Sequence, residues 1–177
     1  MPLSTQIPER VSHCRAYIDN TRLSVTGELT LPDFSRPTQD VSGAGIAGTV
    51  STPTRGNLEA MQASFACRVI TAEALAAFTY AAHSLEFRAV IQGTDATGAI
   101  EQRFSAFMRA IPVSVTSGTV NNGEEMGASV QFEVLDIRID IDGVTFVNVS
   151  KLNNIVQFAN AQGVLVDENA TAQEFLA

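Results

Sequence analysis

The stretch ASVQFEVLDIRIDIDGVTFVNV, residues 128–149, constrains the fold of this chain more than any other segment. Its apolar residues fall on even positions as far as Val134 and on odd positions from Leu135 to Ile141. Alternation with a period of two indicates a strand buried on one face, and a change of parity predicts a β-bulge at Val134–Leu135. Asp142-Gly143 then predicts a tight turn into a second strand, which completes a β-hairpin.

Several other segments have the composition and alternation of strands. Residues 85–93 and 99–115 flank TDATG, a sequence typical of a hairpin turn. Residues 57–70 alternate as well, and shorter strands are expected at 13–20 and 22–32. About seven strands result, so the sequence predicts a mainly β fold, a β-sandwich or barrel.

One segment, TAEALAAFTYAA at residues 71–82, changes to the helical period. Thr71 is suited to cap its N-terminus, and Glu73 favours the first turn. Leu75, Phe78 and Ala82 would share one face. We expect a single substantial α-helix here.

Residues 32–56 form the longest stretch without a clear period and contain three Pro and four Gly. Loops of this length in compact domains are usually functional or disordered. Gly43, Gly45 and Gly48 match the spacing of a dinucleotide-binding loop, but that motif must open a helix, and TVSTP at 49–53 opposes one. We interpret these glycines as permitting unusual backbone angles or a close approach to another chain.

The length of 177 residues favours one domain, residues 1–177. The net charge is −8, and the last third holds most of it, because residues 112–177 carry 2 basic and 9 acidic residues. Nucleic-acid-binding proteins need the opposite sign, so this chain is not expected to grip DNA. No apolar run is long enough to cross a bilayer, and the N-terminus lacks the pattern of a secretory signal.

Titratable groups suited to catalysis are scarce in this chain. His13 and His83 are the only histidines, and structural or solvated roles are expected for both. Cys14 and Cys67 are expected to be small hydrophobic residues rather than metal ligands or a disulfide. Asp136 and Asp140 would share a strand face, but two carboxylates offer calcium too few oxygen ligands. We therefore expect no enzymatic activity, no cofactor and no metal site.

The order of several segments resembles the major tail tube proteins of contractile-tailed bacteriophages. The N-terminal half carries AYIDN, then RLSVTGELTLPDFSR, then QDVSGAGIAGTVSTPTRGNLEAM. The C-terminal part carries IDIDGVTFVNVSKLNNIVQFANAQGVLV, similar to the closing hairpin of that family. The resemblance covers nearly the whole chain. Two departures are Ser150, where an acidic residue would precede Lys-Leu, and the ending DENATAQEFLA, which lacks the usual basic character.

The resemblance implies a β-sandwich subunit that closes into hexameric rings, which stack into the hollow inner tube of a contractile tail. Its partners would be further copies of itself, a sheath protein outside, a baseplate or tail initiator and a tail terminator at the ends. DNA would pass through the lumen during ejection without specific binding. The protein would reside in the virion tail after assembly in the host cytoplasm, without membrane insertion by this chain.

We expect the hairpin at 142–149 to complete a sheet between subunits. The loop at 32–56 and a C-terminal extension at 156–177 would reach neighbouring subunits. The expected contact residues are Pro32, Gly43, Gly45, Ile46, Gly48, Lys151, Leu152, Asn153 and Phe158. An acidic lumen would repel DNA, and its candidate residues are Glu124, Glu125, Glu133, Asp136 and Asp140.

Alternative functions stay open at this point. A phage-tail-like bacteriocin or a secretion system would use the same tube architecture, and a secretion tube would carry effector proteins rather than DNA. A barrel that binds a small ligand is a different class of function and requires a deep pocket with a few convergent polar groups.

Overall fold

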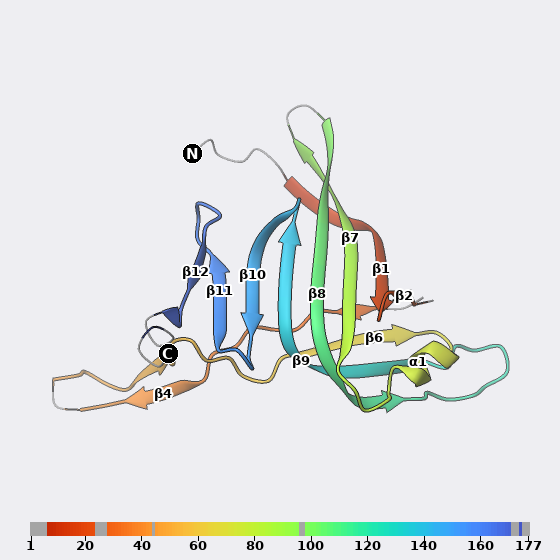
Figure 1. The fold of residues 1–177 in the computed structure, drawn as a ribbon, viewed down its shortest axis with the longest axis horizontal. Coiled ribbons are helices and arrows are strands. Elements are labelled where there is room, and N and C mark those ends of the chain that lie inside the picture. Colours follow the sequence, from red (N-terminus) through yellow and green to blue (C-terminus); the bar gives the residue numbers. More distant parts are fainter. Residues whose placement is uncertain (1–6, 24–27, 44, 96–97, 171–173, 175–177) are drawn as a thin grey trace.

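The computed structural model describes residues 7–170 except 24–27, 44 and 96–97, and also Glu174 (Figure 1). The fold is mainly β, as predicted from the sequence, although the described part holds more strands than the seven expected. The elements are β1 Ile7–Ile18, β2 Thr21–Arg22, β3 Leu29–Thr30, β4 Thr38–Val41, β5 Val50–Pro53, β6 Gln62–Cys67, α1 Ala72–Ala76, β7 His83–Asp95, β8 Gly98–Thr116, β9 Ala128–Ile141, β10 Val144–Ser150, β11 Ile155–Ala159 and β12 Leu165–Asp167.

Strand β9 turns the corner between the two layers of the fold. Its first half pairs with β6 and its second half with β10, while β8 pairs with both halves. Arg109 on β8 is opposite Asp136, but the next residue, Ala110, is opposite Val134, so Leu135 is the extra residue of a bulge. The predicted bulge is confirmed. Below this point the strands run across the view in Figure 1, and above it they run upright.

The main sheet has the order β12-β11-β10-β9-β8-β7-β1-β2, and β6 and β3 extend the folded-over part. Neighbouring pairs are antiparallel. The core lies between the two layers, where Phe65 of β6 meets Phe132 of β9 with ring centroids 5.7 Å apart. The strand predicted within residues 57–70 is confirmed as β6, and its side chains at Ala63, Phe65 and Cys67 face the core. Burial of one large side chain of this kind contributes about 1.5–3 kcal/mol.

The predicted hairpin turn at Asp142-Gly143 is also confirmed. Ile141 and Val144 pair across it, and the φ angles of Asp142 and Gly143 are 51° and 82°. Two positive φ angles define a type I′ turn, whose twist matches that of the flanking strands. The Asp142 carboxylate also accepts a hydrogen bond from the Arg103 backbone N–H at 2.8 Å, which ties the turn to β8.

The helix expected at 71–82 was wrong in its extent and in its buried face. Helix α1 covers only five residues of the predicted 71–82. Its cap is confirmed, since the Thr71 side chain accepts a hydrogen bond from the Ala74 N–H at 3.3 Å. The predicted apolar face is wrong: Leu75 and Phe78 are exposed, whereas Ala74 is buried, because the short helix packs through small side chains.

The strand expected at 22–32 is divided in the structure. β2 pairs with β1, and β3 pairs with β6 in the other layer, so the two ends of this segment belong to different parts of the fold. The intervening residues 24–27 lie outside the described part of the chain.

The segment after Ser150 was expected to extend outward. Instead, β11 pairs with β10 and β12 pairs with β11, so residues 155–167 widen the subunit's own sheet. Val156 is almost fully buried there. Contact of this segment with another subunit stays a prediction.

Candidate functional site

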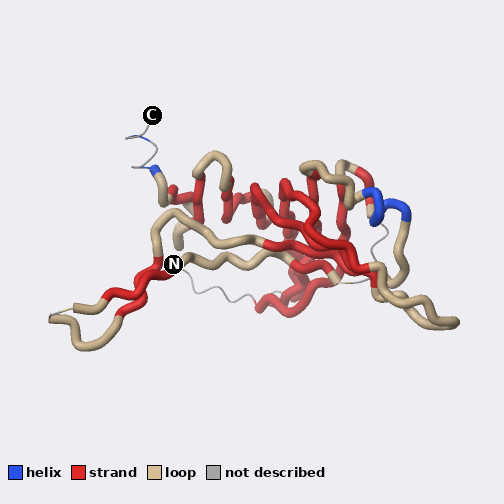
Figure 2. Tube along the Cα trace, turned by 90° about the horizontal axis from the view of Figure 1, so that it is seen from below, coloured by secondary structure: helices blue, strands red, loops and turns tan. Residues whose placement is uncertain are grey.

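The segment expected as a long inter-subunit loop contains a hairpin, which we call the arm (residues 38–53). β4 and β5 pair with each other over four residues and form a separate two-stranded sheet. Every described residue of the arm is exposed. Figures 1 and 2 both show it extending from one end of the molecule, opposite the loop at 117–127. The arm exposes Val41, Ile46 and Val50, and such apolar clusters typically mark protein–protein contacts.

Four of the expected contact residues, Gly43, Gly45, Ile46 and Gly48, lie at the tip of the arm. Gly45 and Gly48 have φ angles of 97° and 117°, which other residues rarely adopt. This tip joins two strands rather than a strand and a helix, so it lacks the context of a dinucleotide-binding loop. The glycines shape a turn, and Ile46 is the large apolar side chain presented there.

Pro32 and Phe158 belong to the subunit's own packing at the base of the arm. Pro32 is buried, and the Phe158 ring packs edge-on against Phe34 at 5.5 Å between centroids. The Arg36 guanidinium lies over the same Phe158 ring and forms an ion pair with Glu168. These contacts fix the arm base to β11 and to the residues after β12.

Asn169 fastens the C-terminal segment beside the arm. Its side-chain N–H groups donate to the carbonyl oxygens of Gly56 and Asn154, at 3.0 and 3.1 Å, and to the Asn154 side-chain oxygen at 3.0 Å. A Cβ on Gly56 would lie 1.7 Å from the Asn169 side-chain oxygen, so only glycine fits there. Sequence reasoning missed this junction, because no local pattern relates residues 56, 154 and 169.

The polar corner after β10 holds the remaining expected contact residues. Lys151 forms an ion pair with Glu133 at 2.8 Å, and Asn153 donates to the Ser150 hydroxyl at 2.8 Å. Leu152 is 71% exposed. Lys151 and Asn153 therefore stabilise the corner, and Leu152 is the exposed apolar side chain of the three.

The five acidic residues expected in a lumen do not form one cluster. Glu124 and Glu125 lie in the loop at 117–127, where Glu125 pairs with Arg68 at 3.2 Å. Glu133, Asp136 and Asp140 are on β9. Glu133 precedes the bulge at Leu135, and Asp136 and Asp140 follow it. Their role in a lumen stays a prediction.

Asp140 is the most enclosed of these carboxylates. The Arg138 guanidinium donates to it at 2.6–3.1 Å, and the Thr145 hydroxyl donates at 2.8 Å. The hydrogen bond from Arg138, with that from Thr145 and against the effect of burial, lowers the pKa of Asp140 below its ordinary value. Asp140 is thus a charged group already compensated within the subunit.

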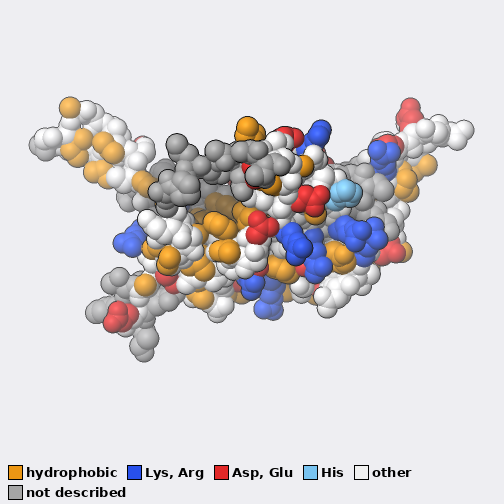
Figure 3. Space-filling model, turned by 90° about the horizontal axis from the view of Figure 1, so that it is seen from above, with side chains coloured by type: hydrophobic (Ala, Val, Ile, Leu, Met, Phe, Trp, Pro, Cys, Tyr) orange, Lys and Arg blue, Asp and Glu red, His pale blue; other side chains and the backbone are white. Residues whose placement is uncertain are grey.

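The upper end of the sandwich exposes apolar side chains that the sequence analysis did not single out. β3 and β6 cover only the lower part of the main sheet, and above them lies an open apolar groove of about 400 Å³ between β1, β7 and β8. Val11, Ile91 and Phe104 line it, and Val11 is 56% exposed. Figure 3 shows hydrophobic side chains around a hollow in this upper view. The alternation that predicted the strands carries no information on where the second layer ends.

Within the described residues, no three His, Cys, Asp or Glu side chains gather in a way that would hold a metal ion. In the same part of the chain, no helix has the length and apolar character required to span a membrane.

Comparisons with known proteins found one matching family and several solved structures with a similar fold. The family described as phage tail tube protein FII matches residues 8–162. A search of the curated proteins gave no match.

Three solved structures share the fold. A chain of the PVC sheath/tube terminator of an extracellular contractile injection system, in its extended state, aligns with a TM-score of 0.53 at 10% identity, over 76% of this chain and 97% of that one. A chain of the PVC sheath-tube complex, also extended, gives 0.50 at 12% identity, over 76% and 90%. A chain of the six-fold symmetrised anti-feeding prophage baseplate gives 0.51 at 10% identity, over 75% and 95%. At these identities the likeness concerns the fold.

Proposed function

Because the chain belongs to the phage tail tube protein FII family and is a structural subunit of a tail tube, we propose that six copies close into a ring and that stacked rings form the tube. The observation that carries this proposal is the arm. It extends from the subunit with all its described residues exposed, and it ends in an apolar tip around Ile46. An exposed apolar hairpin of this kind is stabilised when another copy covers it.

The subunit also offers surface for such an arm to cover. Its upper end is open, with Val11 and Val144 exposed and an apolar groove beside them. The arm and the open end are different surfaces, so a contact between them is heterologous and repeats from copy to copy. Heterologous contacts close into rings or continue as filaments, and a tube of stacked rings uses both modes. The six-fold symmetry of the related baseplate structure supports a ring of six.

Sheath, baseplate and terminator proteins are the proposed partners of the tube. The similar chains come from a sheath-tube complex, a baseplate and a sheath/tube terminator of contractile particles, which supports these kinds of partner. The protein is then part of a tail-like particle. We place its assembly in the host cytoplasm and DNA passage in the lumen, where a subunit charge of −8 disfavours retention of DNA.

A tube that delivers proteins rather than DNA is the second candidate. The similar structures named above come from an extracellular contractile injection system and an anti-feeding prophage, which favours a phage-tail-like particle of this kind. Both candidates require the same subunit contacts. Genes for a capsid beside the gene for this chain would indicate a phage, and their absence with a toxin gene present would indicate an injection particle.

Electron microscopy of the purified chain tests the ring. Hollow rings or tubes in negative stain, with six subunits in averaged end views, are the expected result. A different subunit number in the averages would overturn the hexamer. Rings formed equally well by a variant that lacks residues 42–49 of the arm would overturn the role of the arm.

A further inference from the structure

One face of the main sheet carries an unexpected concentration of arginine. On the strands β1, β7 and β8, an open groove of about 600 Å³ is lined by His13, Arg15, Tyr17, Arg88, Arg103 and Phe107. We call it the cationic groove. It lies on the face opposite the core, because the neighbouring residues Ala16, Phe87 and Ala106 point inward and are buried. Figure 3 shows basic side chains gathered with a His in one region of the upper surface.

The register of the strands brings like charges together in this groove. Arg15 on β1 is directly opposite Arg88 on β7. Arg88 is opposite Ser105 on β8, so Arg103 is its diagonal neighbour on the same face. Like charges directly opposite in a sheet are destabilising unless a counter-charge is present. A chain with a net charge of −8 thus holds a local excess of positive charge at the β1 side of its sheet.

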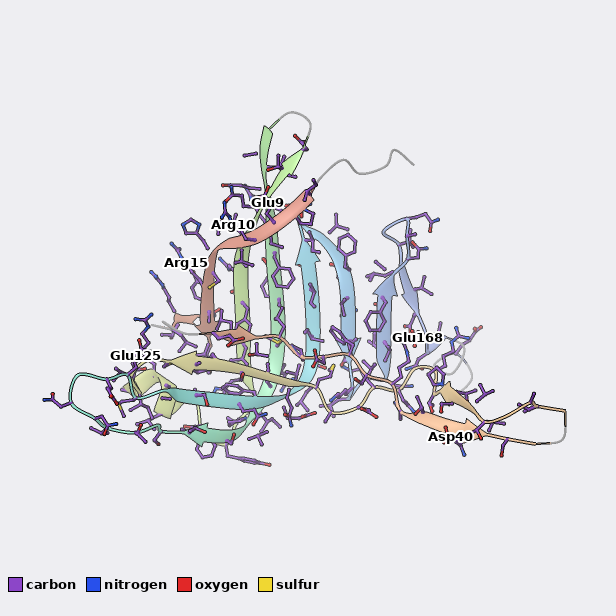
Figure 4. All side chains as sticks on the ribbon, turned by 180° about the vertical axis from the view of Figure 1, so that it is seen from behind. Glu9, Arg10, Arg15, Asp40, Glu125 and Glu168 are labelled. Carbon is purple, nitrogen blue, oxygen red and sulfur yellow. The ribbon has the colours of Figure 1, made fainter. Side chains whose placement is uncertain are left out.

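The internal partners compensate only part of this charge. Glu86 pairs with Arg88 at 2.6 Å, and the Arg88 guanidinium lies 5.1 Å from the centre of the Tyr17 ring. Among the ion pairs of the described residues, none includes Arg15 or Arg103. Both side chains are exposed. Figure 4 shows Arg15 and Arg10 along β1, far from Asp40 on the arm and from Glu168.

We propose that the cationic groove binds an acidic segment of another protein of the tail particle. The planar guanidinium groups of Arg15 and Arg103 match carboxylates, with which they can form paired hydrogen bonds. Tyr17 and Phe107 supply aromatic surface beside the charges, which suits a peptide that also carries apolar side chains.

The surroundings of the groove favour a protein over a nucleic acid. Glu101 lies on the same face above the groove, opposite Gln92. On the next strand, β9, Asp140 and Asp136 follow, and Arg138 there is already paired with Asp140. Among the described residues, the groove's own unpaired cations, Arg15 and Arg103, lie on β1 and β8, about 10 Å apart across three strands. Arg22 and Arg109 lie on the same face outside the groove lining. Duplex DNA carries one charge per roughly 1.7 Å and requires a longer cationic track.

The occupant is a different protein rather than a second copy of this chain. Four of the nine acidic residues in the last third of the chain, Glu125, Glu133, Asp140 and Glu168, already form ion pairs within the subunit. The groove is also on the polar face, whereas the arm and the open apolar end supply the surfaces proposed for copy-to-copy contact.

Binding of fluorescently labelled poly-L-glutamate to the full chain, measured by anisotropy at low salt, tests the groove. The Arg15→Gln/Arg103→Gln variant should bind at least about tenfold more weakly than the wild type, equivalent to about 1.4 kcal/mol. The matched control is Arg55→Gln/Arg109→Gln, which removes the same charge at exposed sites outside the groove. It should change affinity less than about twofold if the groove is the site, since only long-range charge is lost. Equal losses in both variants would overturn the proposal.

Two further readouts separate the alternatives. A DNA duplex of matched charge should bind the wild type more weakly than poly-L-glutamate, and tighter binding of the duplex would overturn the choice of a protein partner. Sedimentation should show the same self-association for the groove variant and the wild type. Loss of self-association in that variant alone would reassign the groove to a second copy. Poly-L-glutamate binding does not require ring formation, so its failure is distinct from failure of the proposed hexamer.

Discussion

The His83 ring nitrogen Nδ1 lies 2.7 Å from the Asp19 carboxylate and joins the start of β7 to the turn after β1. The other ring nitrogen, Nε2, donates to the Thr79 carbonyl oxygen at 3.0 Å. Both nitrogens thus face acceptors, which the doubly protonated imidazolium satisfies. Asp19 also accepts a hydrogen bond from the Ser84 N–H at 2.9 Å. His83 therefore has a structural role, as expected from the sequence: its buried ring is hydrogen-bonded to the exposed carboxylate of Asp19.

This pair should make stability depend on pH. Burial alone would lower the pKa of His83, but the hydrogen bonds to Asp19 and Thr79 outweigh it and raise the pKa. Burial would raise the pKa of Asp19, but the hydrogen bonds from His83 and Ser84 lower it. The His83 contribution is full below about pH 6.5 and is lost as pH rises through the raised pKa. The Asp19 contribution is present above about pH 4 and is lost as pH falls through the lowered pKa.

His83→Gln should therefore reduce the melting temperature most between about pH 4 and 6.5, and less as pH rises above that window. Thermal unfolding followed by circular dichroism from pH 4 to 9 measures this. His13→Gln is the matched control, because His13 is exposed on a sheet face. A deficit of His83→Gln that stays constant from pH 5 to 9 would contradict the account.

Gly143→Ala should destabilise the subunit by about 1 kcal/mol, because φ at this position is 82° and an L-residue there is strained. Gly43→Ala is the control: that glycine is exposed, and a Cβ there meets nothing within 4 Å. Urea unfolding compares the two. If both alanine variants unfold at the same urea concentration, the turn at 142–143 is not the constraint described.

Asn169→Ala should cost about 1–3 kcal/mol, because it leaves the Gly56 and Asn154 carbonyl groups without their side-chain donor. Asn160→Ala is the comparison: the Asn160 side-chain oxygen accepts hydrogen bonds from the Gln162 and Val164 N–H groups, but in an exposed turn where water can replace it, so the loss should be smaller. The free energy of unfolding measures both. A loss no larger for Asn169 than for Asn160 would show that the C-terminal segment is not fastened at the arm base.

Ile46→Asp should leave the subunit folded but reduce assembly at least about tenfold. The side chain is 42% exposed at the arm tip, so the single subunit loses little, whereas a charge in a covered apolar contact is costly. Thr49→Asp adds the same charge to an exposed polar position of the arm. Sedimentation velocity gives the assembled fraction. Normal assembly of Ile46→Asp would remove the tip from the interface.

Much of the fold was predictable where alternation is strict. The parity change in β9 gave the position of its bulge, and Asp142-Gly143 gave the turn, because local backbone chemistry determines both. The arm was not predictable as a hairpin, since both faces of β4 and β5 are exposed and no apolar parity marks them. The helix face was misjudged because Ala74, the residue that packs, carries too little apolar surface to reveal a period.

The functional surfaces were less accessible to sequence reasoning. The acidic residues Glu133 and Asp140 were candidates for a lumen, but their ion pairs with Lys151 and Arg138 depend on the corner and on strand pairing. The cationic groove was not anticipated because Arg15, Arg88 and Arg103 are far apart in the chain and meet only through register. The arm tip was located correctly as a set of residues, and its contacts stay a prediction.

Negative-stain electron microscopy of the concentrated wild-type chain, at low and at high salt, tests the central claim most directly. The account predicts hollow rings or tubes with a central hole for the wild type, and their loss in Ile46→Asp. Compact single subunits of the wild type at every concentration and salt would contradict assembly through the arm and the open end of the sandwich.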